Sequence, residues 1–151
     1  MSHNKHITDG INKDLGERSR EWYMNVTKDW TDPYGLPEVY QHDGFNVVRD
    51  DRIVGSKCRF ADYMMSTVKE DTIVYVQPRK GLAGVSILEA AKRYGKKVVL
   101  FMPSSKEISD HQACCIERGA IPKFRRIAAM PNLNKMAKEY AEEVGGFFVP
   151  L

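Results

Sequence analysis

The sequence has few cysteines, no long apolar run and only a small excess of one charge. Its three cysteines, Cys58, Cys114 and Cys115, include no CxxC pair, which argues against a zinc site and against a disulfide framework. No apolar run approaches the roughly 20 residues of a membrane-spanning helix. The opening stretch, MSHNKHITDGINKD, lacks the apolar core of a signal peptide. We therefore expect a cytoplasmic chain with no membrane span and no metal site.

The composition indicates a folded domain and not a disordered chain, and the mild net charge decides nothing about nucleic acid. The net charge is +3, and 42% of the 151 residues are apolar, which suffices for one domain with a sizeable core. One basic stretch, with Lys123, Arg125 and Arg126, alternates along a strand-like run. No aromatic-rich RNA motif or helix-turn-helix pattern accompanies it, so we interpret it as a solvated edge and do not expect nucleic acid as a partner.

Strand-like and helical patterns alternate in the second half of the chain. Apolar, β-branched runs predict strands at residues 71–77, 96–103, 123–128 and 145–151. Helical periodicity predicts helices at residues 61–68, 82–94, 104–118 and 131–144, with a capping box of Ser104 and Glu107 and a first-turn Pro131. This alternation predicts an α/β fold, a three-layer parallel sheet with helices on both faces.

The first 35 residues follow a different pattern. Weak helical periodicity at residues 11–26 leads into a loop at 29–40 that holds two prolines and a glycine. We therefore predict an N-terminal helical and aromatic arm at residues 1–35, followed by an α/β domain at residues 36–151. The last strand-like run reaches the final residue, so we expect either a longer protein or a partner that covers this strand.

Lys57 stands at an unusual place, in the stretch RDDRIVGSKCRF. The strand-like run at residues 45–48 leads into three charges, then into a Gly-Ser pair, and Lys57 falls in the first turn of the next predicted helix. A helix start favours anions, so a lysine there opposes the helix dipole. Lys57 is either an ordinary solvated lysine or an amine placed beside something anionic.

This stretch resembles the pyridoxal-phosphate enzymes of fold type II, the tryptophan synthase beta-like superfamily. The resemblance rests on Arg49-Asp50-Asp51, followed by Gly55-x-Lys57-x-Arg59 at the start of a predicted helix. The closest resemblance is to the D-cysteine desulfhydrase and 1-aminocyclopropane-1-carboxylate deaminase family, which reads R-D-D, a spacer, then G-G-N-K-x-R-K. Residues 75–103 match its strand, glycine turn, helix and strand ending in M-P, and residues 117–124 match its L-G-A segment. The likeness spans residues 36–151 and the N-terminal half of a typical member.

The resemblance implies a role for Lys57. In that family the lysine forms the Schiff base with pyridoxal 5'-phosphate and shuttles the substrate proton. An amine must be neutral to attack an aldehyde, and a helix start disfavours the charged form, so the position suits this chemistry. The implied function is a pyridoxal-phosphate-dependent lyase or deaminase that acts on a small amino acid.

A second candidate site is the turn QPRKGLAG at residues 77–84. It joins a strand to a helix at the carboxyl end of a parallel strand, where open α/β sheets bind ligands. Gly81 and Gly84 permit close backbone approach, and N–H groups at the helix start suit an anion. The resemblance implies that Gly81 and Gly84 lie against the cofactor.

The same turn would hold the substrate carboxylate, through Arg79, Lys80, Gly81, Leu82 and Ala83. Here the sequence departs from the family, because two cations stand where small polar residues are expected. They would bind a carboxylate or phosphate well, although a plain turn with solvated cations is the alternative. The family's phosphate cradle lies in the half that this chain does not match.

Two functions of other classes remain open. One is a non-catalytic module that binds an anionic ligand at the glycine turn. The other is an assembly protein that uses its last strand and the aromatic segment 22–40 to dock on itself, as a homo-oligomer, or on a partner.

Other candidate residues have simpler interpretations. His111, beside Asp110, is either a base or a partly exposed helix residue, and His42 with Asp43 could border the cleft. We expect Cys58 to be structural although it adjoins Lys57, and at least one residue of the pair at 114 and 115 to face the core.

Overall fold

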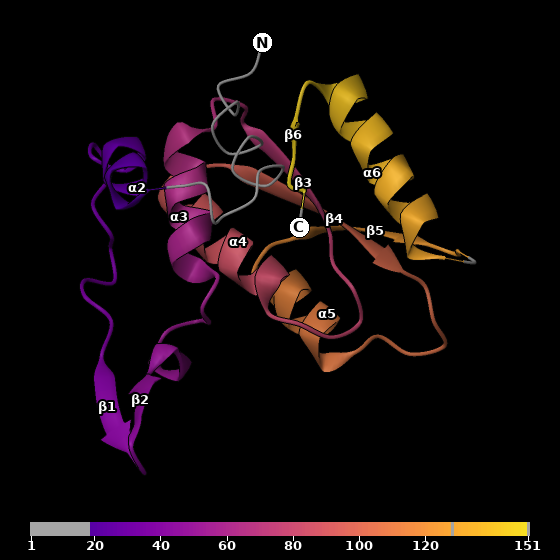
Figure 1. Ribbon diagram of the computed structural model, residues 1–151. Coiled ribbons are helices and arrows are strands. Elements are labelled where there is room, and N and C mark those ends of the chain that lie inside the picture. Colours follow the sequence, from indigo (N-terminus) through magenta and orange to yellow (C-terminus); the bar gives the residue numbers. More distant parts are fainter. Residues whose placement is uncertain (1–18, 128, 151) are drawn as a thin grey trace.

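The computed structural model describes residues 19–127 and 129–150. Its helices are α2 (Arg20–Val26), the 3-10 helix η2 (Asp50–Arg52), α3 (Cys58–Thr67), α4 (Ala83–Arg93), α5 (Asp110–Glu117) and α6 (Met130–Val144). Its strands are β1 (Val39–His42), β2 (Phe45–Val48), β3 (Thr72–Val76), β4 (Lys97–Pro103), β5 (Ile121–Arg125) and β6 (Phe147–Phe148). Figure 1 shows their arrangement.

The centre of the fold is a four-stranded parallel sheet in the order β5-β4-β3-β6. The two central strands pair in register from Thr72 opposite Lys97 to Val76 opposite Phe101. All the strands run the same way, so their carboxyl ends meet at one edge of the sheet. This edge carries the β3–α4 turn and the β4–α5 loop.

The two faces of the sheet are covered by different helices, which confirms the three-layer α/β prediction (Figure 1). On β3, Ile73 and Tyr75 pack into a core with side chains from α3, α4 and α5. The intervening Val74 and Val76 pack against α6 on the other face. Central strands buried on both faces must be apolar at every position, and β3 and β4 are apolar along their buried lengths.

The N-terminus of α5 differs from the prediction. The capping box of Ser104 and Glu107 is wrong, because α5 begins at Asp110 and its N-cap is Ser109. The Ser109 side chain accepts a hydrogen bond from the Gln112 backbone, and the Gln112 side chain accepts one from the Ser109 backbone. Residues 104–109 instead form a loop that Arg79 holds, as described below.

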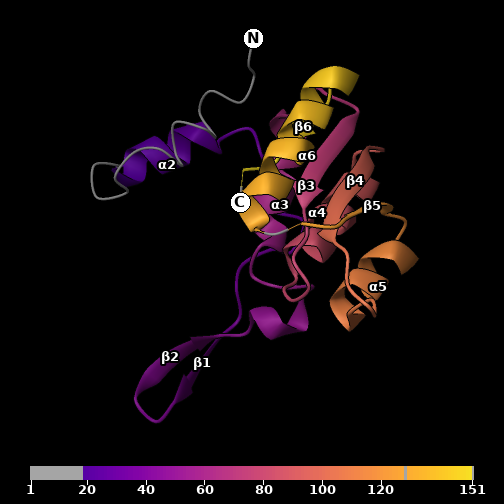
Figure 2. The same cartoon turned by 90° about the vertical axis from the view of Figure 1, so that its right-hand side faces the viewer.

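Residues 39–48 form an antiparallel hairpin and take no part in the parallel sheet. Its two-residue turn is Asp43-Gly44, and both residues have positive φ, as a tight hairpin turn requires. The hairpin projects away from the rest of the molecule (Figure 2), and every residue of its two strands is exposed. The strand expected at residues 45–48 therefore exists, but outside the sheet.

Several predicted elements are shorter in the structure. The third strand is β5, which ends at Arg125, and residue 128 lies outside the described residues. In the described part of the final run, Phe147 and Phe148 form the strand, at the sheet edge beside β3, and residue 151 lies outside the described residues. Gly145 ends α6 in the left-handed conformation. Of the predicted first helix, only Arg20–Val26 falls within the described residues.

The aromatic segment before the hairpin is attached to α3 and α4. Trp30 packs edge-on against Tyr63, with ring centroids 5.7 Å apart, and its indole N–H donates to Asp62 Oδ2 at 2.8 Å. The Tyr34 hydroxyl accepts a hydrogen bond from Arg93 at 3.0 Å. This part of the arm therefore packs on its own chain.

Within the described residues, none of the helices combines the length and apolar character that crossing a bilayer requires.

Candidate active site at the carboxyl edge of the sheet

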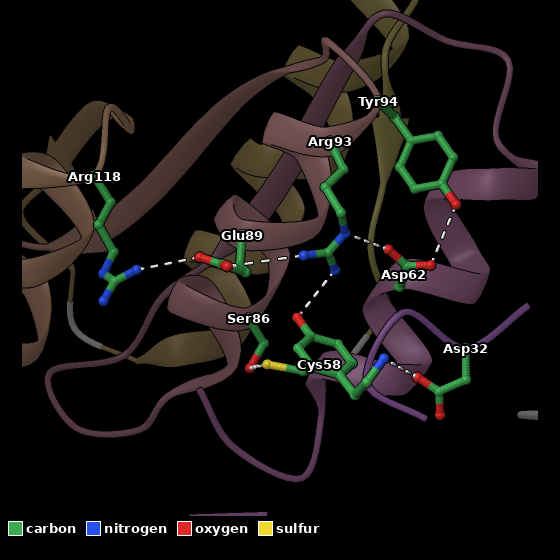
Figure 3. Close-up of polar contacts among 9 residues, drawn as sticks. Asp32, Cys58, Asp62, Ser86, Glu89, Arg93, Tyr94 and Arg118 are labelled. Carbon is green, nitrogen blue, oxygen red and sulfur yellow. Dashed lines mark hydrogen bonds and ion pairs between the residues drawn. The ribbon is translucent and has the colours of Figure 1, made fainter. Parts of the chain in front are cut away.

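Two of the sequence-predicted segments lie together at the carboxyl edge. Gly55, with φ of +134°, lies so close to the start of α4 that an added Cβ would meet the Leu82 side chain and Ser86 Oγ at 3.8 Å. A second contact joins the same two segments. Cys58, the first residue of α3, donates a hydrogen bond from Sγ to Ser86 Oγ at 3.5 Å (Figure 3). The start of α3, with Lys57, therefore adjoins the start of α4.

Lys57 is the N-cap residue of α3, and it is exposed. Its carbonyl accepts the N–H of Ala61 at 2.9 Å, so the backbone is in the first turn of the helix. Its ammonium group has no hydrogen bond or ion pair with any described residue. The side chain is thus free to reach a ligand, and its Schiff-base role stays a prediction.

The acidic residues before Lys57 bind arginines. Arg49 donates to both Asp51 carboxylate oxygens at 2.7 Å, and this hydrogen bonding lowers the pKa of Asp51. Arg59 is paired with Asp32 and lies 3.7 Å from Asp50 Oδ1. The motif therefore connects the arm, η2 and α3. Its partner Asp32 lies 27 residues before Arg59, and no sequence pattern pointed to it.

Gln77 closes the glycine turn from inside. Its side chain is fully buried, and the Oε1 atom accepts the Gly84 N–H at 2.9 Å. The Nε2 atom donates to the carbonyls of Pro78 and Gly81 at 3.0 and 3.1 Å. The Gly84 N–H, expected to be free for an anion, is therefore already bonded. Sequence reasoning missed Gln77, although a polar residue at the end of a buried strand is a signal.

Gly84 and Gly81 are glycines for different reasons. A Cβ on Gly84 would overlap Gln77 Oε1 and lie 3.1 Å from Cys115 Sγ, so only glycine fits between them. Gly81 has φ of +121° and open space beside it. Gly81 therefore leaves room for a ligand at the turn, whereas Gly84 serves internal packing.

Arg79 joins the glycine turn to the β4–α5 loop. Its Nη1 atom donates to Ser105 Oγ and, at 3.0 Å, to the Glu107 carbonyl. In return, the Ser109 hydroxyl donates to the Arg79 carbonyl. These bonds hold residues 104–109 as a loop. Lys80 and Leu82 are exposed and Ala83 is half-buried, all on this turn.

The two candidate histidines lie in different places. His42 Nε2 lies 3.3 Å from Asp43 Oδ2 at the exposed hairpin tip, which Figure 2 shows well away from the sheet. His111 is half-buried in the first turn of α5, beside the β4–α5 loop. Of the two, only His111 is near the carboxyl edge.

Two of the three cysteines are buried. Cys58 and Cys115 are fully buried, whereas Cys114 is half-buried. Burial raises the pKa of the Cys115 thiol to about 11, and neighbouring Cys114 adds to the rise. The prediction that one of the paired cysteines faces the core is confirmed.

The basic stretch of β5 covers aromatic rings. Lys123 Nζ lies 4.5 Å from the centre of the Tyr140 ring, and the Arg125 guanidinium lies 5.7 Å from that of Phe101. These cations therefore take part in packing along an outer strand.

Hollows lie at both edges of the sheet. A groove of about 620 Å³ is lined by the end of α4 and by residues such as Val98 and Gly119, at the amino ends of the strands. A smaller one of about 260 Å³ lies at the carboxyl edge, lined by Ser104, Ser105, Ile108 and Phe124. Open parallel sheets bind ligands at the carboxyl edge, so position favours the smaller hollow.

Asp62 is a buried carboxylate that accepts hydrogen bonds from three more exposed side chains, and Figure 3 shows two of them, Arg93 and Tyr94. Asp62 is 2% exposed and accepts from Trp30 at 2.8 Å, Arg93 at 2.7 Å and Tyr94 at 3.2 Å. A buried carboxylate needs this number of donors. The network connects the arm with α3 and α4, the two helices whose first turns form the site.

Comparison with known proteins supports the fold. No protein-family model and no curated protein matches the chain. Threonine deaminase isoform 2 from Solanum lycopersicum, in processed form, superimposes with a TM-score of 0.72 at 18% identity, over 92% of this chain and 42% of that one. Holo diaminopropionate ammonia lyase from Escherichia coli gives 0.58 at 13% identity, over 91% and 43%. A threonine deaminase from T.th. gives 0.52 at 23%, over 62% and 29%.

The chain thus spans less than half the length of each of these enzymes. At these identities the likeness concerns the fold. The narrower resemblance to D-cysteine desulfhydrase and 1-aminocyclopropane-1-carboxylate deaminase stays a prediction. The parallel sheet with helices on both faces is the fold that the chain shares with part of these enzymes.

Proposed function

We propose that the chain provides part or all of a pyridoxal-phosphate-dependent lyase or deaminase that acts on a small amino acid. The observation that supports this most directly is the position of Lys57. Among the described residues it has no ion-pair partner, and it lies at the first turn of α3, beside the start of α4, at the carboxyl edge of the sheet, where open parallel sheets bind ligands. Lysine is the side chain that condenses with the cofactor's aldehyde.

The residues of the chain suit this chemistry in part. When bound, the cofactor supplies an electron sink for the bond that breaks at the substrate's α-carbon. Lys57 Nζ would hold the aldehyde, then take and return the α-proton. The turn at residues 79–83 would hold the substrate carboxylate, with room for it beside Gly81. The resemblance places the phosphate cradle in the half of the fold that this chain does not match.

Trapping the cofactor tests the proposal. The purified chain is mixed with pyridoxal phosphate and reduced with borohydride, and peptide mass spectrometry locates the adduct. We expect one adduct per chain, on Lys57, absent in Lys57→Ala. Lys92→Ala is the matched control, because Lys92 is an exposed lysine at the other end of α4 and its loss should leave the labelling unchanged. Labelling scattered over many lysines, or none, would contradict the proposal for this chain.

The hairpin favours a second candidate function, self-association. Val39, Phe45 and Val48 are 56%, 72% and 52% exposed. An isolated two-stranded hairpin is barely stable in water, so a projecting apolar one favours a covering surface. This differs from the sequence-based alternative, because part of the aromatic arm packs on its own chain. An oligomer is compatible with the enzyme function.

A further inference from the structure

The orientation of Arg79 makes it suitable for binding an anion. Its Nη1 atom is held by Ser105 and the Glu107 carbonyl, which fixes the guanidinium in place. The Nε and Nη2 atoms have no hydrogen-bond partner among the described residues, although these two donors form the edge that clasps a carboxylate or phosphate. A guanidinium fixed on one side and open on the other loses little entropy when it binds an anion.

Within the part of the chain that the structure describes, no ion pair neutralises the cations of this turn, although Glu107 and Asp110 stand on the adjoining segment. Among the described residues, Arg79, Lys80 and Lys106 make no ion pair. Five other arginines, Arg49, Arg52, Arg59, Arg93 and Arg118, are paired with acids. Among the described residues Arg20, Arg125 and Arg126 make no ion pair either. Lys57 is also without an ion pair in the described part of the chain, next to the start of α4. The glycine turn thus has an excess of positive charge beside the open space at Gly81.

The turn carries more positive charge than is required to bind an amino acid with an uncharged side chain. The single α-carboxylate of such a substrate would meet one cation or a few N–H groups, and the others would remain without a counter-charge. A substrate with a second anionic group would neutralise them, and Arg79 and Lys80 are adjacent in the turn that would receive it. The fixed guanidinium favours an anion with two oxygens in a plane.

We propose that this turn selects amino acids whose side chain ends in a second anionic group, either a carboxylate or a phosphate. The inference rests on the proposed function, since it assigns a substrate class to that site. Arg79 would bind the second anion through its Nε and Nη2 atoms, and Lys80 would provide the further charge. Both are specificity-determining residues and neither takes part in proton transfer.

Nuclear magnetic resonance titration of the full chain, with pyridoxal phosphate present, tests the inference. The probes are aspartate, O-phosphoserine, alanine and inorganic phosphate, and the backbone N–H signals of residues 77–84 report binding. We expect aspartate or O-phosphoserine to bind at least about tenfold more tightly than alanine, since one charge-assisted contact is worth about that factor. Preference for one of the two identifies the anion as carboxylate or phosphate.

Two variants of the turn and one control variant test whether the turn causes this preference. Lys80→Ala should reduce the preference by about tenfold or less, and Lys92→Ala, which removes an exposed lysine far from the turn, should keep it. Arg79→Lys keeps the charge but loses the two-pronged edge, so it should weaken binding of the second anion. Thermal melting confirms that each variant is folded.

Several outcomes would overturn the inference. These are equal affinity for aspartate, O-phosphoserine and alanine, an equal loss in Lys92→Ala, and phosphate that binds as tightly as O-phosphoserine. Labelling of Lys57 is measured separately. Labelling without a preference for dianionic amino acids would refute the inference alone, whereas no labelling would refute the proposed function.

Discussion

The Gly84 N–H donates to Gln77 Oε1 at 2.9 Å, across the turn that the sequence marks as a ligand site. The bond joins the end of β3 to the first turn of α4, and both partners are buried. It satisfies a donor that helix starts leave unpaired. The turn is therefore shaped by its own chain, and a ligand would meet the exposed residues 79–82 and not the amide of Gly84.

Gly84→Ala should destabilise the chain more than an alanine at another glycine. The added methyl group would overlap Gln77 Oε1 and press on Cys115 Sγ at 3.1 Å, in a place with no room to relax. Overpacking together with a lost buried hydrogen bond predicts a decrease of about 3 kcal/mol in the free energy of unfolding.

Urea unfolding measures this decrease, and Gly119→Ala is the control. Gly119 has φ of +92° and open space around it, so alanine there costs only backbone strain, about 1 kcal/mol. An equal decrease in the free energy of unfolding in the two variants would show that the space between Gly84 and Gln77 accommodates a methyl group.

Asp62→Ala should release the aromatic arm. The substitution leaves Trp30, Arg93 and Tyr94 without their shared acceptor. Water reaches Arg93 and Tyr94, so the free energy of unfolding should fall by about 1 to 2 kcal/mol. In a Trp22→Phe background, the fluorescence of Trp30 should shift to longer wavelength because the indole becomes more exposed.

Asp51→Ala is the comparison for this prediction. Asp51 also pairs with an arginine, but its side chain is 61% exposed, so its loss should change stability by less than about 1 kcal/mol. An unchanged Trp30 spectrum in Asp62→Ala would mean that the arm docks through packing alone.

Cys115 should make the protein less stable at high pH. The folded-state pKa is about 11, above the ordinary value of 9.0, because the thiol is buried. Below pH 9 both states keep the proton, and stability does not depend on this group. Between pH 9 and 11 the unfolded state releases the proton first, so stability falls, by about 2 kcal/mol in total.

In Cys115→Ala, the stability should fall less between pH 9 and pH 11, because only the contributions of other titrating groups remain. The measurement is the difference in urea midpoint between the wild type and the variant from about pH 8 to about pH 11. A difference that stays constant with pH would contradict the assigned cause.

The hairpin should mediate self-association. Light scattering during size-exclusion chromatography should give a mass above that of one chain, and Phe45→Ser with Val47→Ser should reduce it to one chain. Leu36→Ser is the control, because Leu36 is 92% exposed but lies before the hairpin. A wild type that elutes as a single chain at every concentration would refute this function.

The sequence by itself determined the layers of the fold. The runs that became β3 and β4 are apolar at successive positions, which is the pattern of strands buried on both faces, and α6 shows a regular apolar stripe with Pro131 at its start. These signals are local, since they depend on residues a few positions apart. The place of Lys57 at a helix start followed from the same kind of signal.

Only the tertiary structure decided which groups meet. Gln77 reaches across its turn to Gly84, Asp62 accepts from residues about 30 positions away on either side, and Arg79 holds a loop that a capping pattern had assigned to a helix. Such bonds join segments distant in the chain, and their partners are chosen by burial, because an unpaired polar group inside the fold costs free energy. A sequence read in short windows shows each group but not its partner.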